Sequence, residues 1–528
     1  MADDPNANSN SSASRPVFET VPIDDVHDDG DISSGRRETL VPEEIKDDHV
    51  DPFNDGSVIE EIEEDTPEDL TVSDISGAIP SSPPPGDIPT FEDGDDGSNV
   101  KKYALIGLGV VGVIVVLIVI FSVVFGLLRG SSNKKITLEY WGLWEDPVVM
   151  KSVIEDYKRV KPNVTINYVV RETTDYRIKL ITRAKEGGGP DIFRFHNTWL
   201  PSIIDVAAPM PSSVMSNSEY EKTFYPIIQS DMKYDNAYYG MALGIDGLVL
   251  LYNNELFKRA GITSAPKTWD DVVRAADKLR VEGPDGRLVT SGIALGSAKN
   301  IEHFSDIIGW MLIQNGAQLN KLSAPEAVEV LTNYRQFAEP QLNFWNSSMP
   351  SDVNAFVQKK VAMIIVPSWH ILNIKKSNPE LDMKVAALPI LPGSEPVSLA
   401  TYWAEGVSRS SKNQEAAWEF LAYLSSKETM TKLFQEQSKV RAFGVPYSRV
   451  DLRDTLIQNE YIGPVLEQAP HMKSMPMSAR TFDQGLNDEI ISYIRNAVNS
   501  TEEGVSYNSA FSTAENGVNQ VLTKYNIQ

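Results

Sequence analysis

The stretch that decides the fold is residues 136–193, ITLEYWGLWEDPVVMKSVIEDYKRVKPNVTINYVVRETTDYRIKLITRAKEGGGPDIF. Apolar residues alternate over 136–140 and 164–170, as they do on one face of a strand. They follow helical spacing over 149–160 and about 175–185, and a short apolar run follows the three glycines. Strand, helix, strand, helix, strand is the order typical of a parallel sheet with crossover helices. The sequence therefore predicts an α/β fold.

Two loops at the ends of these predicted strands are rich in aromatic and polar side chains. Residues 141–145 follow the first strand, and residues 194–199 follow the third. Ligands of open α/β sheets bind at the carboxyl ends of the strands, where such loops converge. Further along, residues 268–271 (TWDD) have the pattern of a capping box at the start of a helix, and residues 416–424 have helical apolar spacing.

Charge is distributed very unevenly over the 528 residues. Residues 1–100 hold 28 acidic and 4 basic side chains, whereas the rest of the chain holds 45 and 44. Low hydrophobicity with high net charge predicts a disordered acidic tail over 1–100, either a solvated spacer or a docking segment for a basic partner. The near-neutral remainder gives no indication of nucleic-acid binding. The chain has no cysteine, which excludes disulfides, thiol catalysis and attachment of lipid through cysteine.

An uncharged apolar run occupies residues 103–128. A helix of this length would be about 39 Å long, enough to cross a hydrocarbon core of about 30 Å. The run predicts one uncleaved transmembrane helix, since it is too long for a signal-peptide core and lies far from the N-terminus. Lys101 and Lys102 precede it, and Arg129, Lys134 and Lys135 follow it, so flanking charge does not decide the orientation.

Four segments in the later part of the chain resemble the extracellular solute-binding proteins of ABC importers, most closely the sugar-binding branch. They are 188–193 (GGPDIF); 239–240 with 250–257 (LLYNNELF) and 266–269 (PKTW); 360–364 (KVAMI) leading to Trp369 and 388–389; and 411–421 (SKNQEAAWEFL). Each motif is weak alone, but their order over the whole region after the apolar run is specific. The family is usually exported by a cleaved signal or tethered through a lipidated cysteine, and this chain departs from that pattern.

The resemblance implies a periplasmic-binding-protein-like domain over 134–528, with two α/β lobes joined by a hinge. By analogy the first lobe comprises about 136–248 and 400–446, and the second about 249–399 and 447–528. It also implies a receptor that holds a small solute, expected to be a carbohydrate, in the cleft between the lobes and delivers it to ABC permease subunits. The domain would then lie outside the membrane, with the acidic tail in the cytoplasm.

A carbohydrate site needs aromatic platforms for C–H faces and polar side chains for hydroxyls. The candidates come from the two predicted loops and from the crossings between the lobes. One more comes from the position at which the sugar-binding family carries a stacking aromatic. The expected ligand-binding residues are Trp144, Glu145, His196, Asn197, Asp246, Trp369, Tyr402 and Trp403. Weaker candidates are Trp310, Trp345, Arg441 and Arg480.

No catalytic residue, cofactor or metal ion is expected. The six histidines include no pair at metal-binding spacing, and neither a P-loop nor a G-x-S-x-G motif occurs. A G-x-G-x-x-G sequence at 107–112 lies inside the apolar run, where it does not follow a strand. Two alternatives stay open: a ligand-sensing subunit of a signalling system, and a receptor for a peptide, a polyamine or an organic anion.

Overall fold

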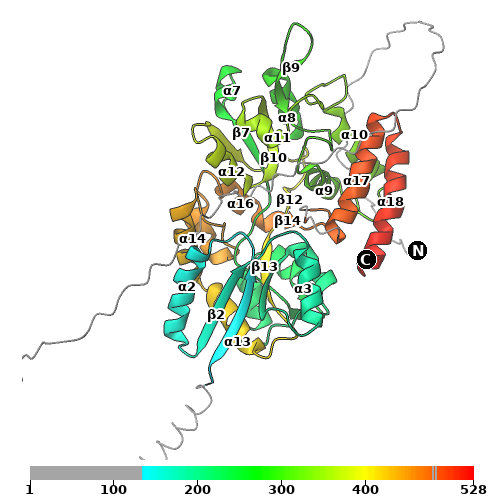
Figure 1. Ribbon diagram of the computed structural model, residues 1–528. Coiled ribbons are helices and arrows are strands. Elements are labelled where there is room, and N and C mark those ends of the chain that lie inside the picture. Colours follow the sequence, from blue (N-terminus) through cyan, green and yellow to red (C-terminus); the bar gives the residue numbers. More distant parts are fainter. Residues whose placement is uncertain (1–133, 479–480, 482–484, 528) are drawn as a thin grey trace, which may run out of the picture. The chain divides into compact units, whose positions relative to one another are not determined.

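The computed structural model describes residues 134–478, 481 and 485–527 (Figure 1). The predicted acidic tail over 1–100 and the predicted membrane helix over 103–128 both lie outside these residues. Within the described part of the chain, no helix has both the length and the apolar character needed to cross a membrane.

The first of two five-stranded sheets has the strand order β2-β1-β3-β13-β6. Strand β1 runs parallel to β2 and β3, whereas β13 runs antiparallel to β3 and β6. The parallel part confirms the predicted alternation of strands and crossover helices, with α2 and α3 as the crossovers. The bounds are β1 Ile136–Gly142, α2 Pro147–Val160, β2 Val164–Val170, α3 Tyr176–Lys185, β3 Ile192–His196, β6 Met241–Ala242 and β13 Trp403–Val407.

Helix α2 shows how local sequence sets these elements. The side chain of Asp146 caps its first turn by accepting a hydrogen bond from the N–H of Val148 at 2.8 Å, and Pro147 occupies the first turn. The helix ends at Val160, and Pro162 follows two residues later. Its buried face packs on the sheet and on α13 and α14, which come from much later in the chain (Figure 1).

The second sheet has the strand order β11-β7-β10-β9-β8. Strand β10 is buried along its whole length, pairing antiparallel with β7 and parallel with β9. Helix α8 packs on β9, and its predicted capping box is present: Thr268 and Asp271 exchange hydrogen bonds between side chain and backbone. The bounds are β7 Leu248–Asn253, α8 Trp269–Leu279, β8 Val281–Glu282, β9 Leu288–Ile293, β10 Val361–Pro367 and β11 Met383–Ala386.

The remaining elements cover the two sheets or connect them. The helices are η1 Asn197–Trp199, α4 Leu200–Ile203, α5 Asn217–Thr223, α6 Pro226–Asp231, α7 Asn254–Arg259, α9 Phe304–Gln314, α10 Pro325–Gln336, α11 Asp352–Val357, α12 His370–Ser377, α13 Gln414–Leu424, α14 Lys427–Val440, η2 Val450–Leu452, α15 Arg453–Leu456, α16 Gly463–Gln468, η3 Ala469–His471, α17 Leu486–Glu502 and α18 Tyr507–Lys524. The short strands are β4 Lys233–Tyr234, β5 Ala237–Tyr238, β12 Ser398–Leu399 and β14 Met472–Lys473. Helices α17 and α18 pair with each other beside α9 and α10 (Figure 1).

The chain passes from one sheet to the other at places that lie side by side. The segment between β6 and β7 pairs with the segment between β12 and β13 through Gly247 and Ala400. The N–H of Ile245 donates to the carbonyl of Pro446 at 2.9 Å, and β12 runs parallel to β14. Hinges between lobes are formed by a few residues in loops or at the ends of elements, and these crossing segments are such places. The residue limits given above for the lobes stay a prediction.

Candidate functional site

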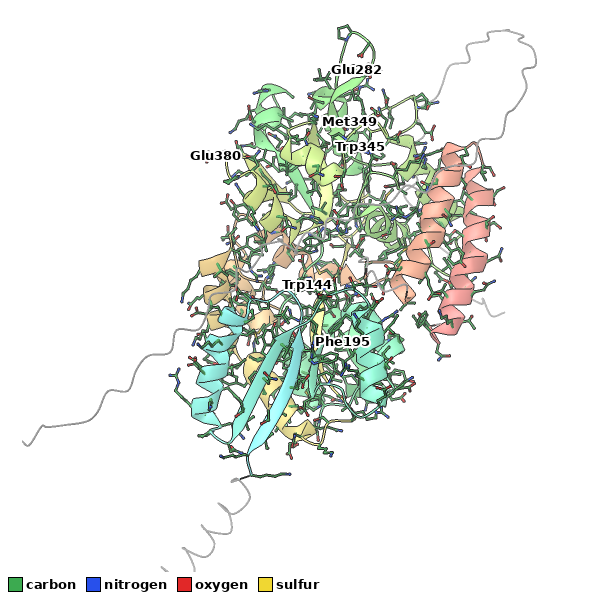
Figure 2. All side chains as sticks on the ribbon, viewed as in Figure 1. Trp144, Phe195, Glu282, Trp345, Met349 and Glu380 are labelled. Atoms are coloured by element: carbon green, nitrogen blue, oxygen red, sulfur yellow. The ribbon has the colours of Figure 1, made fainter. Side chains whose placement is uncertain are left out.

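The loop after β1 presents Trp144 from the end of the first sheet that faces the second (Figure 2). Trp144 has a φ of 56°, a left-handed conformation that costs a bulky residue roughly 1–3 kcal/mol. The loop is fixed from below by Arg194 on β3, whose Nη1 donates to the carbonyl of Leu143 at 3.0 Å. Arg194 is in turn paired with the buried carboxylate of Glu405 on β13, at 2.6 Å from Nη2 to Oε1. Backbone strain held by a buried ion pair is typical of a functional position.

Trp403, the first residue of β13, lies at the centre of an aromatic group in the first lobe. Its ring meets Trp144 at 4.6 Å, and His196 and Trp199 each at 5.2 Å, all edge to face. Trp199 and His196 are buried, whereas Trp144 and Trp403 are partly exposed. The first lobe therefore offers two indole rings to its surroundings, supported from beneath by two buried rings.

His196 is fully buried and has a partner for both ring nitrogens. Nδ1 lies 2.8 Å from the hydroxyl of Thr198, and Nε2 lies 3.1 Å from the hydroxyl of Thr401. Burial lowers the pKa of His196 to about 3, against the opposing effect of the negative charge of Asp306, so the ring is neutral. This geometry supports a role for His196 in holding Trp403, and a direct contact with ligand stays a prediction.

Asn197 and Tyr402 are also buried, and both are bonded to a carboxylate that the sequence did not single out. Oδ2 of Asp231, at the end of α6, accepts from Nδ2 of Asn197 at 3.0 Å and from the hydroxyl of Tyr402 at 2.9 Å. Ser474, just after β14, donates to the same oxygen at 2.6 Å. Burial raises the pKa of Asp231 to about 6, although the three hydrogen bonds act in the opposite direction. Asp231 thus connects the first sheet to the segment after β14.

Asp246 lies in a crossing segment and orders two of the aromatic loops. Its Oδ1 accepts from the N–H of Ser368, next to Trp369, at 3.2 Å, and its carbonyl accepts from the N–H of Thr401 at 3.0 Å. Trp403 follows two residues after Thr401. Burial raises the pKa of Asp246 to about 6, opposed by hydrogen bonds to its carboxylate. One crossing segment therefore ties together the loops that carry Trp369 and Trp403.

The second lobe contributes Trp369, which follows β10 and is partly exposed. Its ring stacks on His370 at 3.7 Å and meets His303 edge to face at 5.8 Å. His303 and His370 face each other through Nε2 at 2.8 Å, and Nδ1 of His303 lies 3.2 Å from Oδ2 of Asp306. Burial would lower the pKa of His303, but the carboxylate of Asp306 raises it to about 9, while burial and the charge of His303 lower the pKa of His370.

Exposure divides the eight expected site residues into two groups. Trp144, Asp246, Trp369 and Trp403 are partly exposed, and the other four are buried and bonded to protein groups. Among the latter, Glu145 is 3.5 Å from Nη2 of Arg441, a weaker sequence candidate that the structure places beside it. The further candidates Trp310 and Trp345 are fully buried, which is a core position, and Arg480 lies outside the described residues.

Several residues near these positions were missed by sequence reasoning: Asp231, His303, Asp306, His370 and Ser474. Their spacing along the chain did not single them out, because the decisive contacts are distant in sequence: Asp231 is 171 residues from Tyr402, and His303 is 67 residues from His370. Two lobes joined by paired crossing segments, each with a partly exposed indole ring, are the arrangement of a solute-binding class of protein, because small-molecule sites occur preferentially at interfaces between domains.

The family comparison agrees with that class. The chain belongs to the family of bacterial extracellular solute-binding proteins, whose model matches residues 142–431. The resemblance inferred from the four sequence segments is therefore confirmed.

Known relatives are similar to this chain in sequence, and solved structures are similar to it in fold. The multiple sugar-binding protein of Streptococcus mutans is 22% identical over 380 residues, covering 66% of this chain and 84% of that protein. An ABC transporter solute-binding protein of Thermotoga lettingae, solved with α-D-tagatose, has a TM-score of 0.58 at 24% identity and covers 73% of this chain and 99% of its own. A cyclo/maltodextrin-binding protein solved with maltotetraose has a TM-score of 0.60 at 19% identity, covering 74% and 98%. These similarities confirm the two-lobed α/β fold.

Proposed function

We propose that the chain is the receptor of an ABC importer and binds a carbohydrate between its two lobes without changing it chemically. The observation that carries the proposal is the exposure of three indole rings on opposite sides of the crossing segments: Trp144 and Trp403 on the first lobe and Trp369 on the second. Such rings suit the apolar faces of sugars, and the partly exposed carboxylate of Asp246 lies beside the loops that carry Trp369 and Trp403. The ligands named for the relatives support a sugar as the solute.

Because the three indole rings are carried by two different lobes, binding of a ligand would be coupled to closure of the lobes. A ligand that touches Trp369 and Trp144 together contacts both lobes only when they are close, so it shifts the population toward the closed form. The crossing segments around Asp246 would absorb the backbone rotation, because they carry the links between the lobes. The closed form would then dock on permease subunits.

The apolar run over 103–128 would tether this receptor to the membrane and keep it at high effective concentration beside the permease. In this arrangement the acidic tail lies in the cytoplasm and the solute-binding domain outside. Protease treatment of intact cells should remove the domain and spare the tail, and digestion of the tail alone would contradict the topology.

The binding proposal is tested by screening the full-length chain, purified in detergent, by thermal shift against mono- and oligosaccharides. A ligand at 100 times its Kd should stabilise the folded state by about 2.7 kcal/mol. Trp369→Ala and Trp144→Ala should each weaken binding about tenfold, since an aromatic contact contributes about 1.5 kcal/mol. Tyr234→Ala, which removes an exposed ring from the β4–β5 hairpin, is the matched control and should bind as the unmodified chain does.

Two outcomes would contradict the proposal. No response to any sugar, together with a clear response to peptides, polyamines or organic anions, would assign a different solute to the same lobes. Equal affinity of the Trp369→Ala, Trp144→Ala and Tyr234→Ala variants for a responding sugar would place the sugar site elsewhere.

A further inference from the structure

A cluster of three metal-binding side chains lies next to Trp369 in the second lobe. His303 directly precedes α9, and His370 is the first residue of α12, 67 residues later. Glu302 completes the cluster with a carboxylate whose side chain is 43% exposed. One ligand atom from each of these three residues lies within 4.8 Å of the others. The spacing of the histidines along the chain did not indicate a metal site. The tertiary structure brings Glu302, His303 and His370 together.

We infer that Glu302, His303 and His370 form a binding site for a divalent transition-metal ion of the Zn²⁺ type. The inference does not depend on the identity of the solute.

The distances between the ligand atoms lie within about 0.6 Å of those expected for a tetrahedral site. The two Nε2 atoms are 2.8 Å apart, and Oε1 of Glu302 lies 3.9 Å from Nε2 of His303 and 3.8 Å from Nε2 of His370. Metal–ligand bonds of about 2.0–2.1 Å at tetrahedral angles require ligand atoms about 3.4 Å apart. The three distances bracket this value, so shifts of about half an ångström would complete the geometry.

The surroundings of the cluster hold the rings in place. Nδ1 of His303 faces the carboxylate of Asp306, the arrangement that orients a metal-binding histidine and leaves its Nε2 toward the metal. His370 is held by stacking on Trp369. The backbone N–H of Glu302 donates to Asp352 at 3.3 Å, which fixes the start of the segment that carries the ligands.

Charge favours a dication at this place. Three carboxylates, from Glu302, Asp306 and Asp352, lie around the two imidazoles. A divalent ion held by Glu302, His303 and His370 would balance part of this negative charge. Two nitrogens and one carboxylate oxygen suit zinc, nickel or copper, whereas calcium and magnesium prefer oxygen ligands alone.

Three protein ligands leave the fourth tetrahedral position open. The exposed side of the site is that of Glu302, so water can occupy this position. The buried sides are closed by His303 and His370, which are 6% and 2% exposed.

The experiment measures binding of Zn²⁺ and Co²⁺ to the full-length chain in detergent after treatment with a chelator. We expect one Zn²⁺ per chain by calorimetry and a visible Co²⁺ absorption of the intensity typical of four-coordinate sites. His303→Gln and His370→Gln should each weaken Zn²⁺ binding at least about a hundredfold, and Glu302→Gln about tenfold. His471→Gln, which changes an exposed histidine on η3, is the matched control and should leave binding unchanged.

Absence of Zn²⁺ binding by the unmodified chain would overturn the inference, as would equal binding by the doubly substituted His303→Gln, His370→Gln chain. Circular dichroism and the Tm establish that each variant is folded. If a buried histidine variant does not fold, Glu302→Gln decides, since its side chain is exposed: undiminished affinity and an unchanged Co²⁺ spectrum in that variant would also overturn the inference.

Discussion

Replacing Asp231 by Asn should remove a pH-dependent loss of stability that arises from one half-buried carboxyl group. Asp231 accepts hydrogen bonds from Asn197, Tyr402 and Ser474, all at Oδ2. Burial nevertheless raises its pKa from 3.8 to about 6. The ionised form is therefore less stable in the folded chain than in the unfolded chain.

The sign and size of the effect follow from this shift. Because the pKa of Asp231 is higher in the folded chain, its protonated carboxyl group stabilises the fold fully at pH values below the unfolded pKa of 3.8. This stabilisation is lost as pH rises through the folded pKa of about 6. The difference between the unfolded pKa of 3.8 and the folded pKa of about 6 corresponds to a total of about 3 kcal/mol, of which about 2 kcal/mol is lost between about pH 4 and pH 8. Asn is nearly isosteric with Asp and does not titrate in this range.

Urea unfolding of the full-length chain, followed by tryptophan fluorescence at several pH values, measures the difference. Between about pH 4 and pH 8, the free energy of unfolding of the unmodified chain should decrease by about 2 kcal/mol more than that of the Asp231→Asn variant. Asp205→Asn, which changes an exposed carboxylate of the same lobe, is the matched control. If Asp231→Asn and Asp205→Asn show the same pH profile, the raised pKa of Asp231 is refuted.

Three further substitutions test a buried ion pair, a helix cap and a close helix–strand contact, each by urea unfolding at neutral pH. Nη2 of Arg194 lies 2.6 Å from Oε1 of the buried Glu405. Arg194→Met removes this cation, and the unpaired buried carboxylate should lower the free energy of unfolding by about 3–5 kcal/mol. Thr268→Ala removes the hydroxyl that accepts from the N–H of Asp271 and should cost about 1 kcal/mol. Gly292→Ala places a methyl group against the backbone of α8 and should cost about 1–3 kcal/mol through displacement of that helix from β9.

Each of these three has its own control. Replacing both members of the ion pair, as Arg194→Met with Glu405→Leu, should recover part of the loss, and an equal or larger loss would contradict the buried-charge explanation. Thr268→Ser should retain the cap, so a loss equal to that of Thr268→Ala would exclude capping as the cause. The added methyl group of Gly188→Ala would meet open space, so this variant should be about as stable as the unmodified chain. Equal stability of Gly292→Ala and Gly188→Ala would contradict the expected clash with α8.

Much of the fold was predictable because it depends on local patterns. Alternating apolar residues predicted β1 and β2, helical spacing predicted α2 and α3, and the TWDD pattern predicted the cap of α8, all of which the structure confirms. The antiparallel strand β13 was not expected from the first five elements. It joins the sheet from more than 200 residues away, and its pairing with β3 depends on a contact that no local pattern encodes.

The candidate site was predictable only as a pair of loops. The sequence placed Trp144 and His196 at the carboxyl ends of β1 and β3, because strand ends converge at one edge of a sheet. It could not distinguish a ring that reaches solvent from one that is enclosed. Trp144 is partly exposed, whereas His196 is buried with both nitrogens bonded, since its partner Thr401 comes from a segment 205 residues later.

From the sequence by itself, short-range apolar spacing determined the alternation of strands and helices, and four motifs that resemble those of solute-binding proteins indicated the family. Only the tertiary structure decided that Asp246 ties the Trp369 and Trp403 loops together and that His303 meets His370. The physical reason is that such contacts arise from packing of the lobes and crossing segments, which sets distances between residues regardless of their separation in the chain.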